Sequence, residues 1–405
     1  MRLLMLLSLL LASPWAHGQA LSPKEALGKA IFFDTRYSEP QGQSCASCHD
    51  PRTGWTAPEP RLGGPMEGAI PTRFGNRKPP TVAYAGWTPK LHRDEEGTYA
   101  GGLFWDGRAT GHARDPLAEQ AEAPFLNPLE QNLPNRRALV AKLRTAPYAE
   151  AFRKIWKLAP DAWDRQSDHV YRRVADSLAA YQRSREVNPF DSRFDAFYRA
   201  ARRKKLDILS IRPDNQRRFE GLGLEPQELR GLALFNDKGK CAECHVLTPG
   251  PGGTPPLFTD FTYDNLGLPR NPENPFYRMA SAHNPLGEAW VDPGLEATLA
   301  AIPAHARHAA ANRGKHRVPT LRNVDQRPAP DFVKTFGHNG FFRSLEDFVR
   351  FYNTRDLGGF PPPEVKANMN TEELGNLGLT PEEEAALVAF MKTLSDRRIA
   401  LPPSP

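Results

Sequence analysis

Ser44-Cys45-Ala46-Ser47-Cys48-His49 contains a Cys-x-x-Cys-His pentad, the pattern that attaches a c-type haem. Its two thiols reach two vinyl groups along one edge of a porphyrin, and the adjacent imidazole then points at the iron. The pentad returns at Cys241-Ala242-Glu243-Cys244-His245. The sequence therefore predicts two covalently bound c-type haems, attached through Cys45, Cys48, Cys241 and Cys244, with His49 and His245 as iron ligands.

Paired cysteines also occur in zinc sites and in thioredoxin-like redox motifs. Zinc coordination does not require a histidine directly after each pair, and the two pairs lie far apart in this chain. A redox pair belongs to a strand-to-helix context and has no need of that histidine. Since these are the only four cysteines, no thiol is left for a structural disulfide.

Residues 1–20 have the features of a cleaved signal peptide. Arg2 provides the positive charge, residues 3–12 form an apolar run too short to span a bilayer, and Gly18-Gln19-Ala20 offers small residues for cleavage. We therefore expect export to the periplasm and a mature chain that begins near Leu21. An uncleaved anchor is the alternative, and no later run predicts a membrane span.

The mature chain is too long for one ordinary domain, and the two haem motifs divide it. We predict an N-terminal domain at 21–205 and a C-terminal domain at 206–405, each with a core around its own porphyrin. Apolar residues at spacings of three and four predict helices at 138–155, 169–181, 344–352 and 380–394. No alternating run predicts a substantial sheet, and 40 prolines and 31 glycines indicate long loops, so the predicted fold class is mainly α.

The net charge of +6 is compatible with an acidic partner, but it is unevenly distributed. Seven Lys and Arg residues lie in the stretch 201–218, between the predicted halves. Such a run is more typical of a solvated linker than of a docking patch. We expect no nucleic-acid partner.

A polar and aromatic group follows the first haem motif, with Trp105 in Phe104-Trp105-Asp106-Gly107-Arg108-Ala109 and then Gln120, Pro124 and Glu130. A carboxylate and an amide above an open iron could move protons between the two oxygens of a bound peroxide, which is general acid–base catalysis. The alternative is that Trp105 is a core residue and Glu130 a carboxylate at a helix start. The residues alone favour that alternative.

Several further motifs occur in a characteristic order along nearly the whole mature chain: Phe32-Phe33-Asp34-Thr35-Arg36-Tyr37-Ser38, Pro80-Thr81-Val82, the Trp105 motif and Val318-Pro319-Thr320-Leu321-Arg322-Asn323-Val324. With the two haem motifs they resemble the bacterial di-haem cytochrome c peroxidase and MauG family. The resemblance implies two cytochrome c-like helical domains with a calcium ion between them. It also implies that Glu130 is the distal acid and base, that Gln120 positions it, and that Trp105 relays electrons between the haems.

The axial ligands distinguish the two branches of this family. In the ordinary peroxidases, a loop histidine before the Pro-Thr-Val segment blocks the first haem until the second is reduced. Residues 50–91 contain no histidine, and His92 and His112 lie on the wrong side of that segment. We therefore expect an open first haem with His49 as its one protein ligand.

At the second haem, Tyr352 stands where the peroxidases have a methionine, and the MauG branch also has a tyrosine there. An anionic oxygen ligand would stabilise ferric and higher iron states. Met369 and Met279 are rival ligands, and an ordinary aromatic residue on a helix face is the other reading of Tyr352.

Other positions depart from the family pattern or fit it less well. Gly239 replaces the tryptophan that MauG has two residues before the first cysteine of the second motif, so the protein substrate of MauG is not expected here. Asn76 and the backbone carbonyls of Arg327 and Ala329 lie near the family's calcium positions, although the local spacing differs.

The expected function is that of a periplasmic di-haem oxidoreductase. It would react with hydrogen peroxide at the His49 haem and oxidise a protein or small-molecule donor by long-range electron transfer, as the MauG branch does. One alternative is an ordinary cytochrome c peroxidase that takes electrons from a small c-type cytochrome or copper protein. Another is a non-enzymatic di-haem electron carrier. A homodimer is compatible with the resemblance.

Overall fold

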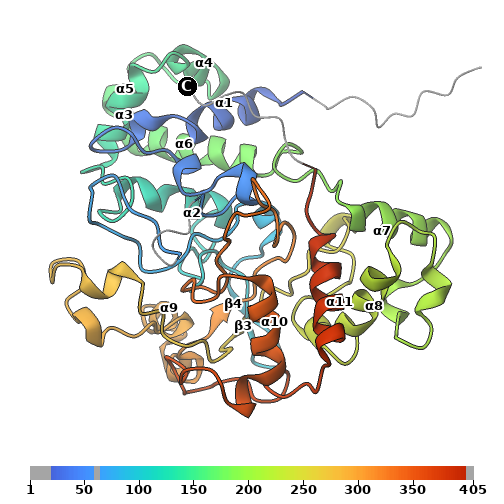
Figure 1. Ribbon diagram of the computed structural model, residues 1–405. Helices are drawn as coiled ribbons and strands as arrows, with labels where there is room; N and C mark the ends of the chain where they lie inside the picture. The colour runs from blue at the N-terminus through green and yellow to red at the C-terminus, as the bar shows by residue number, and fades with distance from the viewer. Residues whose placement is uncertain (1–19, 59–63, 398–405) are drawn as a thin grey trace, which may run out of the picture.

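The computed structural model describes residues 20–58 and 64–397, which form a mainly α-helical molecule with long connecting segments (Figure 1). All but the last residue of the predicted signal peptide lies outside this part. The helices are α1 (Pro23–Phe32), α2 (Pro116–Leu126), α3 (Arg136–Arg144), α4 (Ala149–Ile155), α5 (Ala162–Arg165), α6 (Ser167–Gln182), α7 (Arg193–Arg203), α8 (Pro226–Phe235), α9 (Leu295–Ala300), α10 (Leu345–Thr354) and α11 (Pro381–Lys392). The prediction of a mainly α fold is confirmed.

The strands in the described part of the chain are two residues long and form two antiparallel pairs. β1 (His92–Arg93) pairs with β2 (Tyr99–Ala100), and β3 (Tyr263–Asp264) pairs with β4 (His316–Arg317). The second pair joins segments that are far apart in the sequence, on either side of α9.

Two hydrophobic cores lie side by side. The first contains buried side chains from α1, α2, α3 and α6, which lie together at the upper left of Figure 1. The second contains buried side chains from α7, α8, α10 and α11. Each core includes one haem motif at its edge, because Cys45 packs against the first and Cys241 against the second.

The two cores repeat one helix crossing. In the first, α1 crosses α6 at Gly28, where an added Cβ would lie 1.9 Å from the carbonyl oxygen of Ser177. In the second, α8 crosses α11 at Gly231, where an added Cβ would lie 1.9 Å from the carbonyl oxygen of Ala386. Glycine permits both close approaches because it has no side chain. The helix before each haem motif is therefore held in the same way.

Local signals explain where several helices begin and end. Thr380 caps α11 and forms a reciprocal capping box with Glu383, and Pro381 occupies the first turn, as expected for a helix start there. The helices predicted at 169–181 and 344–352 are present as α6 and α10. The helix predicted at 138–155 is broken into α3 and α4, because Pro147 cannot continue a helix.

The chain passes from the first core to the second earlier than predicted. Val187 is the last residue of the first core before the crossing, and Phe194 on α7 is already buried in the second. The predicted boundary at 205/206 is therefore displaced, because the apolar face of α7 packs with the C-terminal half. The basic stretch 201–218 is likewise not a free linker, since Ile208, Ile211 and Phe219 are buried in the second core.

Buried polar contacts join the two halves. Arg322, on the C-terminal side, is 1% exposed; both of its terminal nitrogens lie 3.0 Å from oxygens of Asp195, and its guanidinium lies 4.8 Å from the ring of Tyr84 in the first half. The Lys334 ammonium donates to the carbonyls of Thr53, Asn323 and Gln326 at 2.9, 2.9 and 3.2 Å. These contacts fix the relative placement of the two cores. No helix within 20–58 and 64–397 is long and apolar enough to cross a membrane.

Candidate haem sites

The first haem motif borders a cavity that contains the predicted site residues of the N-terminal half. The cavity is lined by His49 and Cys48 together with Gln120, Glu130 and Trp105. A short 3₁₀ turn, Cys45–Ser47, places the motif, and the backbone N–H of His49 donates to the carbonyl of Cys45 at 3.0 Å. The structure thus brings together Trp105, Gln120 and Glu130, which are up to 25 positions apart in the sequence.

Both motif histidines are oriented as iron ligands require. His49 Nδ1 lies 3.2 Å from the carbonyl oxygen of Trp55, and His245 Nδ1 lies 2.9 Å from that of Phe258. Since a carbonyl can only accept, Nδ1 is the donor and Nε2 keeps its lone pair for a metal. Burial lowers the pKa of each imidazole to about 4, so both are neutral, as ligation requires.

The thiols of the two motifs are free and half-buried. Burial raises the pKa of Cys45, Cys48 and Cys241 to about 12. Free thiols in a Cys-x-x-Cys-His pattern at the edge of a cavity are what thioether attachment of a porphyrin requires. The residues present therefore fit a c-type haem in each half.

Glu130 lies in a setting that favours proton transfer. Its Oε1 accepts from Asn127 Nδ2 at 2.7 Å. Burial raises the pKa of Glu130 above its ordinary value, against the opposing effects of Arg108 and of this hydrogen bond. Gln120 and Pro124 of α2 line the same cavity. A carboxyl group whose pKa is raised is better suited to accept and return a proton than an ordinary carboxylate.

Within residues 20–58 and 64–397, His49 is the one histidine that lines the first cavity. His92 and His112 instead bond to the backbone carbonyls of Lys90 and Leu91, at 2.9 and 2.8 Å. Met66, however, lines the cavity together with His49. No sequence pattern singled out this methionine, because only the path of the loop that follows the motif brings it there.

The second cavity is lined by His245, Cys241 and Cys244, with Tyr352 contributed by α10. Burial raises the pKa of the Tyr352 phenol well above its ordinary value, and the nearby cysteines add to the effect. Met369 and Met279, the rival ligands, do not line this cavity. Of the three candidate ligands, Tyr352 therefore lines the cavity beside the second haem motif, whereas Met369 and Met279 do not.

Trp105 lies between the two cavities and lines both. Its indole Nε1 donates to the carbonyl of Lys78 at 2.7 Å, and its own carbonyl accepts from the backbone N–H of Arg317 at 2.8 Å. One hydrogen bond thus holds the indole ring, and the other holds the backbone of Trp105. The electron-relay role of Trp105 stays a prediction.

Two buried cations flank Trp105. Lys78 is 9% exposed and Arg317 is 7% exposed, and neither forms an ion pair with a carboxylate among the described residues. Burial lowers the pKa of Lys78 to about 8 and also lowers that of Arg317. Buried cations of this kind need anionic partners. Haem propionates would supply them, so Lys78 and Arg317 are residues that would hold the haems in place.

Known proteins provide an independent comparison. The family model for di-haem cytochrome c peroxidases matches residues 22–203. The methylamine utilization protein MauG of Paracoccus denitrificans is 34% identical to this chain over 390 residues, covering 92% of this chain and 88% of MauG. The chain belongs to the di-haem cytochrome c peroxidase family. It is accordingly a peroxidase-type oxidoreductase, and the family implies two haems.

Other family members resemble the chain over a similar extent. The cytochrome-c peroxidase IdrP1 of Denitromonas iodatirespirans is 27% identical, covering 92% of this chain and 81% of that protein. The crystal structure of the diheme peroxidase BthA from Burkholderia thailandensis E264 superposes with a TM-score of 0.73 at 32% identity, covering 96% of this chain and 89% of BthA. The family relationship therefore extends over both halves.

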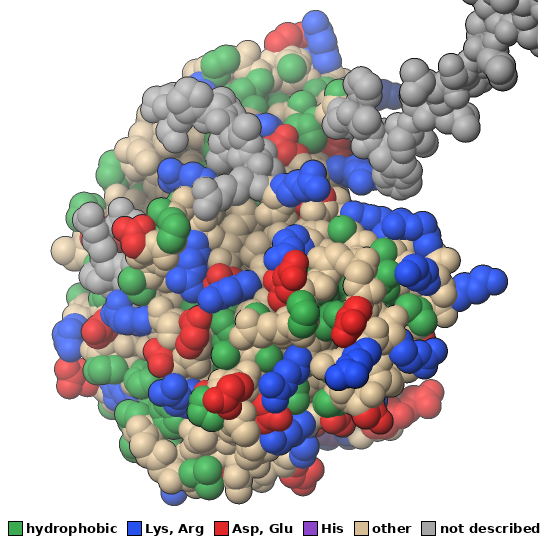
Figure 2. Space-filling view, turned by 45° about the vertical axis from the view of Figure 1, so that its right-hand side comes forward, with side chains coloured by type: hydrophobic (Ala, Val, Ile, Leu, Met, Phe, Trp, Pro, Cys, Tyr) green, Lys and Arg blue, Asp and Glu red, His purple; other side chains and the backbone are tan. Residues whose placement is uncertain are grey.

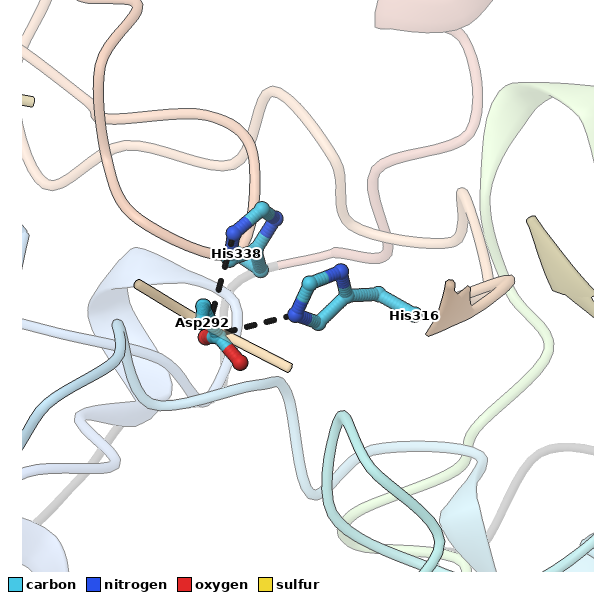
Figure 3. Close-up of side chains that lie close together, drawn as sticks. All are labelled: Asp292, His316 and His338. Carbon is cyan, nitrogen blue, oxygen red and sulfur yellow. Dashed lines mark ion pairs between the residues drawn. The ribbon is translucent and has the colours of Figure 1, made fainter. Parts of the chain in front are cut away.

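A charged cluster lies beside Trp105 in this family member. The imidazoles of His316 and His338 both point toward Asp292 (Figure 3), with Nε2-to-Oδ2 distances of 3.3 and 3.9 Å. Both histidines also line the second cavity. Burial disfavours the ionised form of Asp292, but Arg77 and His316 outweigh it and hold its pKa well below the ordinary value.

Two imidazole nitrogens and a carboxylate are also a donor set for divalent transition metals. Here Arg77 already donates to both oxygens of Asp292, at 2.7 Å each, and Arg77 further bonds Asp106 at 2.5 Å. The two imidazole rings are stacked, with centroids 3.6 Å apart and planes 10° apart. The nitrogen lone pairs of parallel stacked rings do not converge on one ion. Arg77 is therefore the cation that pairs with Asp292 in this cluster.

Asn76 and the carbonyls of Arg327 and Ala329 are the groups expected to bind calcium, and this expectation stays a prediction. Asn76 lines the first cavity, and its carbonyl accepts from Asn274 Nδ2 at 3.0 Å. Arg327 pairs with Asp325 at 2.6 Å. In the same region between the halves, a carbonyl cage is already filled by the ammonium of Lys334.

Proposed function

We propose that this di-haem enzyme reduces hydrogen peroxide at the His49 haem and oxidises a separate protein or small-molecule donor through Trp105, in the manner of the MauG branch. The observation that carries the proposal is the first cavity, where Glu130 and Gln120 accompany His49 and the described residues of the lining include no second histidine. When bound, the haem supplies the iron that accepts peroxide and exchanges electrons.

The side chains of the cavity supply proton transfer. Reduction of one hydrogen peroxide to two water molecules consumes two electrons and two protons. Glu130 would accept a proton from one oxygen of the peroxide and return it to the other, while Asn127 holds its carboxyl group in place. Gln120 orients the peroxide from the adjacent wall. The electrons come from the donor and reach the first cavity past Trp105.

Tyr352 supports the MauG-like form of the proposal. Its side chain lines the second cavity together with His245, and a tyrosinate would favour oxidised iron there. An ordinary cytochrome c peroxidase is the second candidate, favoured by Met66, which could close the first haem as the loop histidine does in that branch. The third candidate, a di-haem electron carrier, would require two axial protein ligands on both irons in every redox state.

Electron paramagnetic resonance and optical spectra of the fully oxidised protein decide among these functions. The MauG-like proposal predicts a high-spin ferric signal that one equivalent of peroxide removes without prior reduction. If peroxide reacts only after one haem is reduced, the ordinary peroxidase is correct. In that case Met66→Leu should restore the high-spin signal in the oxidised protein. No reaction in any state identifies a carrier.

We further propose export to the periplasm with cleavage before Leu21, which amino-terminal sequencing of the haem-containing protein tests.

Calcium bound near Asn76 and the carbonyls of Arg327 and Ala329 also stays a proposal, and metal analysis after dialysis against a chelator tests it. A homodimer is tested by light scattering.

A further inference from the structure

Two buried imidazoles lie beside Trp105 at the second haem cavity. His316, on β4, and His338 are 9% and 8% exposed, and both line this cavity. Their rings are stacked with centroids 3.6 Å apart, and the His338 ring lies 6.4 Å from that of Trp105. Neither histidine takes part in the proposed reaction with peroxide. A charge on either ring would nevertheless act on the second cavity and on the proposed electron route.

The oxygen atoms around His316 favour a proton on each of its ring nitrogens. Nδ1 lies 3.0 Å from the carbonyl oxygen of Gly314, and Nε2 lies 3.3 Å from Oδ2 of Asp292 (Figure 3). A carbonyl oxygen and a carboxylate oxygen are both acceptors. Either neutral tautomer of His316 would therefore turn a nitrogen lone pair toward an oxygen, whereas an imidazolium presents a proton to each.

His338 lies farther from the same carboxylate and is neutral. Its Nε2 is buried without a hydrogen bond to the described residues and lies 3.9 Å from Oδ2 of Asp292. Burial, and then the charge of His316, lower the pKa of His338 well below its ordinary value, although Asp292 acts in the opposite direction. Two charged rings stacked at 3.6 Å would repel each other, while a neutral ring can stack on a charged one.

The carboxylate beside His316 is tightly held by other groups. Arg77 donates to both oxygens of Asp292 at 2.7 Å, and it also pairs with Asp106. The backbone N–H of Gly294 donates to Asp292 Oδ1 at 2.9 Å. One guanidinium thus serves two buried carboxylates, and a proton on His316 supplies a second positive charge to Asp292. The surroundings therefore stabilise the protonated form of His316.

Two further charged groups face the pair of histidines. Arg317 follows His316 on β4 and lines both cavities, where it would hold haem propionates. Glu364 interacts electrostatically with His316 and accepts from Tyr277 at 3.0 Å, while burial raises the pKa of Glu364 above its ordinary value. At the surface, Figure 2 shows Lys and Arg side chains interspersed with Asp and Glu, and water and salt screen such charges. A buried charge such as that of His316 therefore acts on the second cavity more strongly than an exposed charge at the same distance.

We infer that His316 is a buried imidazolium that raises the reduction potential of the second haem, with Asp292 holding its proton in place. A positive charge at the cavity wall favours the iron state that has one electron more, and burial strengthens this effect because the surroundings are less polar than water. His316 then opposes Tyr352, whose oxygen would favour oxidised iron. The inference rests on the proposed function, in which electrons reach the first cavity past Trp105. It adds a positioning residue that sets how readily the second haem gives them up.

The test makes the same substitution at two stacked positions of one cavity wall. His316→Gln removes the charged ring, and His338→Gln removes the neutral ring beside it. The potential of the second haem is measured near neutral pH by spectroelectrochemical titration of the haem-loaded protein. In His316→Gln the equilibrium constant for reduction of the second haem should fall about tenfold, which is about 59 mV for a one-electron couple. His338→Gln should keep the original potential.

The charge of His316 can also be restored or removed by other means. His316→Lys keeps a positive charge beside Asp292, so its potential should be close to that of the unmodified protein. In the unmodified protein the potential should fall as the pH rises and His316 loses its proton, because the cation that favours the reduced state is then gone. This step should be absent from His316→Gln and present in His338→Gln.

An unchanged potential in His316→Gln, or an equal fall in both glutamine variants, overturns the inference. If His316→Gln does not bind haem, His316→Lys decides, because a fall of about tenfold in its equilibrium constant contradicts a role of the charge and a retained potential supports it. These measurements need no peroxide. A protein that does not react with peroxide therefore refutes the proposed function, while the potential of the second haem still tests the role of His316.

Discussion

Glu130 is the residue whose replacement tests the proposed chemistry most directly. Glu130→Gln keeps the shape and the contact with Asn127 but cannot exchange a proton. We expect the rate of reaction with peroxide to fall by about 10²–10⁴-fold, the usual contribution of general acid–base catalysis. Stopped-flow optical measurements give this rate. Glu67→Gln is the matched control, because Glu67 lines the same cavity but is exposed.

The pH dependence of the same rate follows from the environment of Glu130. The carboxylate must be ionised to take the first proton, so the rate should fall as the pH drops through the pKa of Glu130. Burial raises that pKa, and the midpoint should lie above the value of about 4.3 found for a free glutamate. Glu130→Gln should abolish this dependence, and a midpoint at or below the ordinary value contradicts the role.

Tyr352 is the proposed axial ligand of the second haem iron, and its replacement tests this assignment. Tyr352→Phe removes the oxygen and leaves the ring, which packs against Phe348 at 5.4 Å. We expect the low-spin ferric signal of the second haem to be replaced by a high-spin signal. An unchanged spectrum shows that another group is the ligand. Tyr277→Phe is the control, because Tyr277 is a buried tyrosine that bonds Glu364 away from both cavities.

At the scale of helices, Gly28 and Gly231 are the positions where an added side chain is tolerated least. An alanine at Gly28 or Gly231 brings a methyl group within 1.9 Å of a carbonyl oxygen, so the helices must separate. We expect each substitution to lower the free energy of unfolding by about 1–3 kcal/mol or more. Gly75→Ala is the control, since its nearest neighbour would be a carbonyl at 3.6 Å. Thermal unfolding followed by circular dichroism measures the difference.

Helices also show how far local sequence determines structure here. The start of α11 was predictable because Thr380, Pro381 and Glu383 act within one turn. The break between α3 and α4 was missed because apolar spacing continues on both sides of Pro147 and conceals the interruption. The haem motifs were recognisable for the same local reason, since two thiols and an imidazole lie within five residues.

Contacts across the whole molecule were beyond sequence patterns. Met66 in the first cavity and the cluster of Asp292, His316 and His338 depend on long loops folding back between the halves. The early crossing from one core to the other, between Val187 and Phe194, depends on which half buries the apolar face of α7. These features follow from tertiary packing, to which spacing along the chain gives no access.

Arg322 is the contact through which the stability of the two halves is most closely coupled. Arg322→Met leaves Asp195 buried without its cation and removes the guanidinium from the face of Tyr84, so we expect unfolding to become easier by about 3–5 kcal/mol. Replacing Asp195 by Asn in the same chain should recover part of this loss, because the unpaired charge is then absent. Arg350→Met, which removes the pair between the exposed Arg350 and Glu384 at 3.7 Å, should lower the free energy of unfolding by less than about 1 kcal/mol.

Urea unfolding of the haem-loaded protein should also show two separated transitions in Arg322→Met, since the first core loses a buried partner in the second. A single transition at the original midpoint would contradict this coupling.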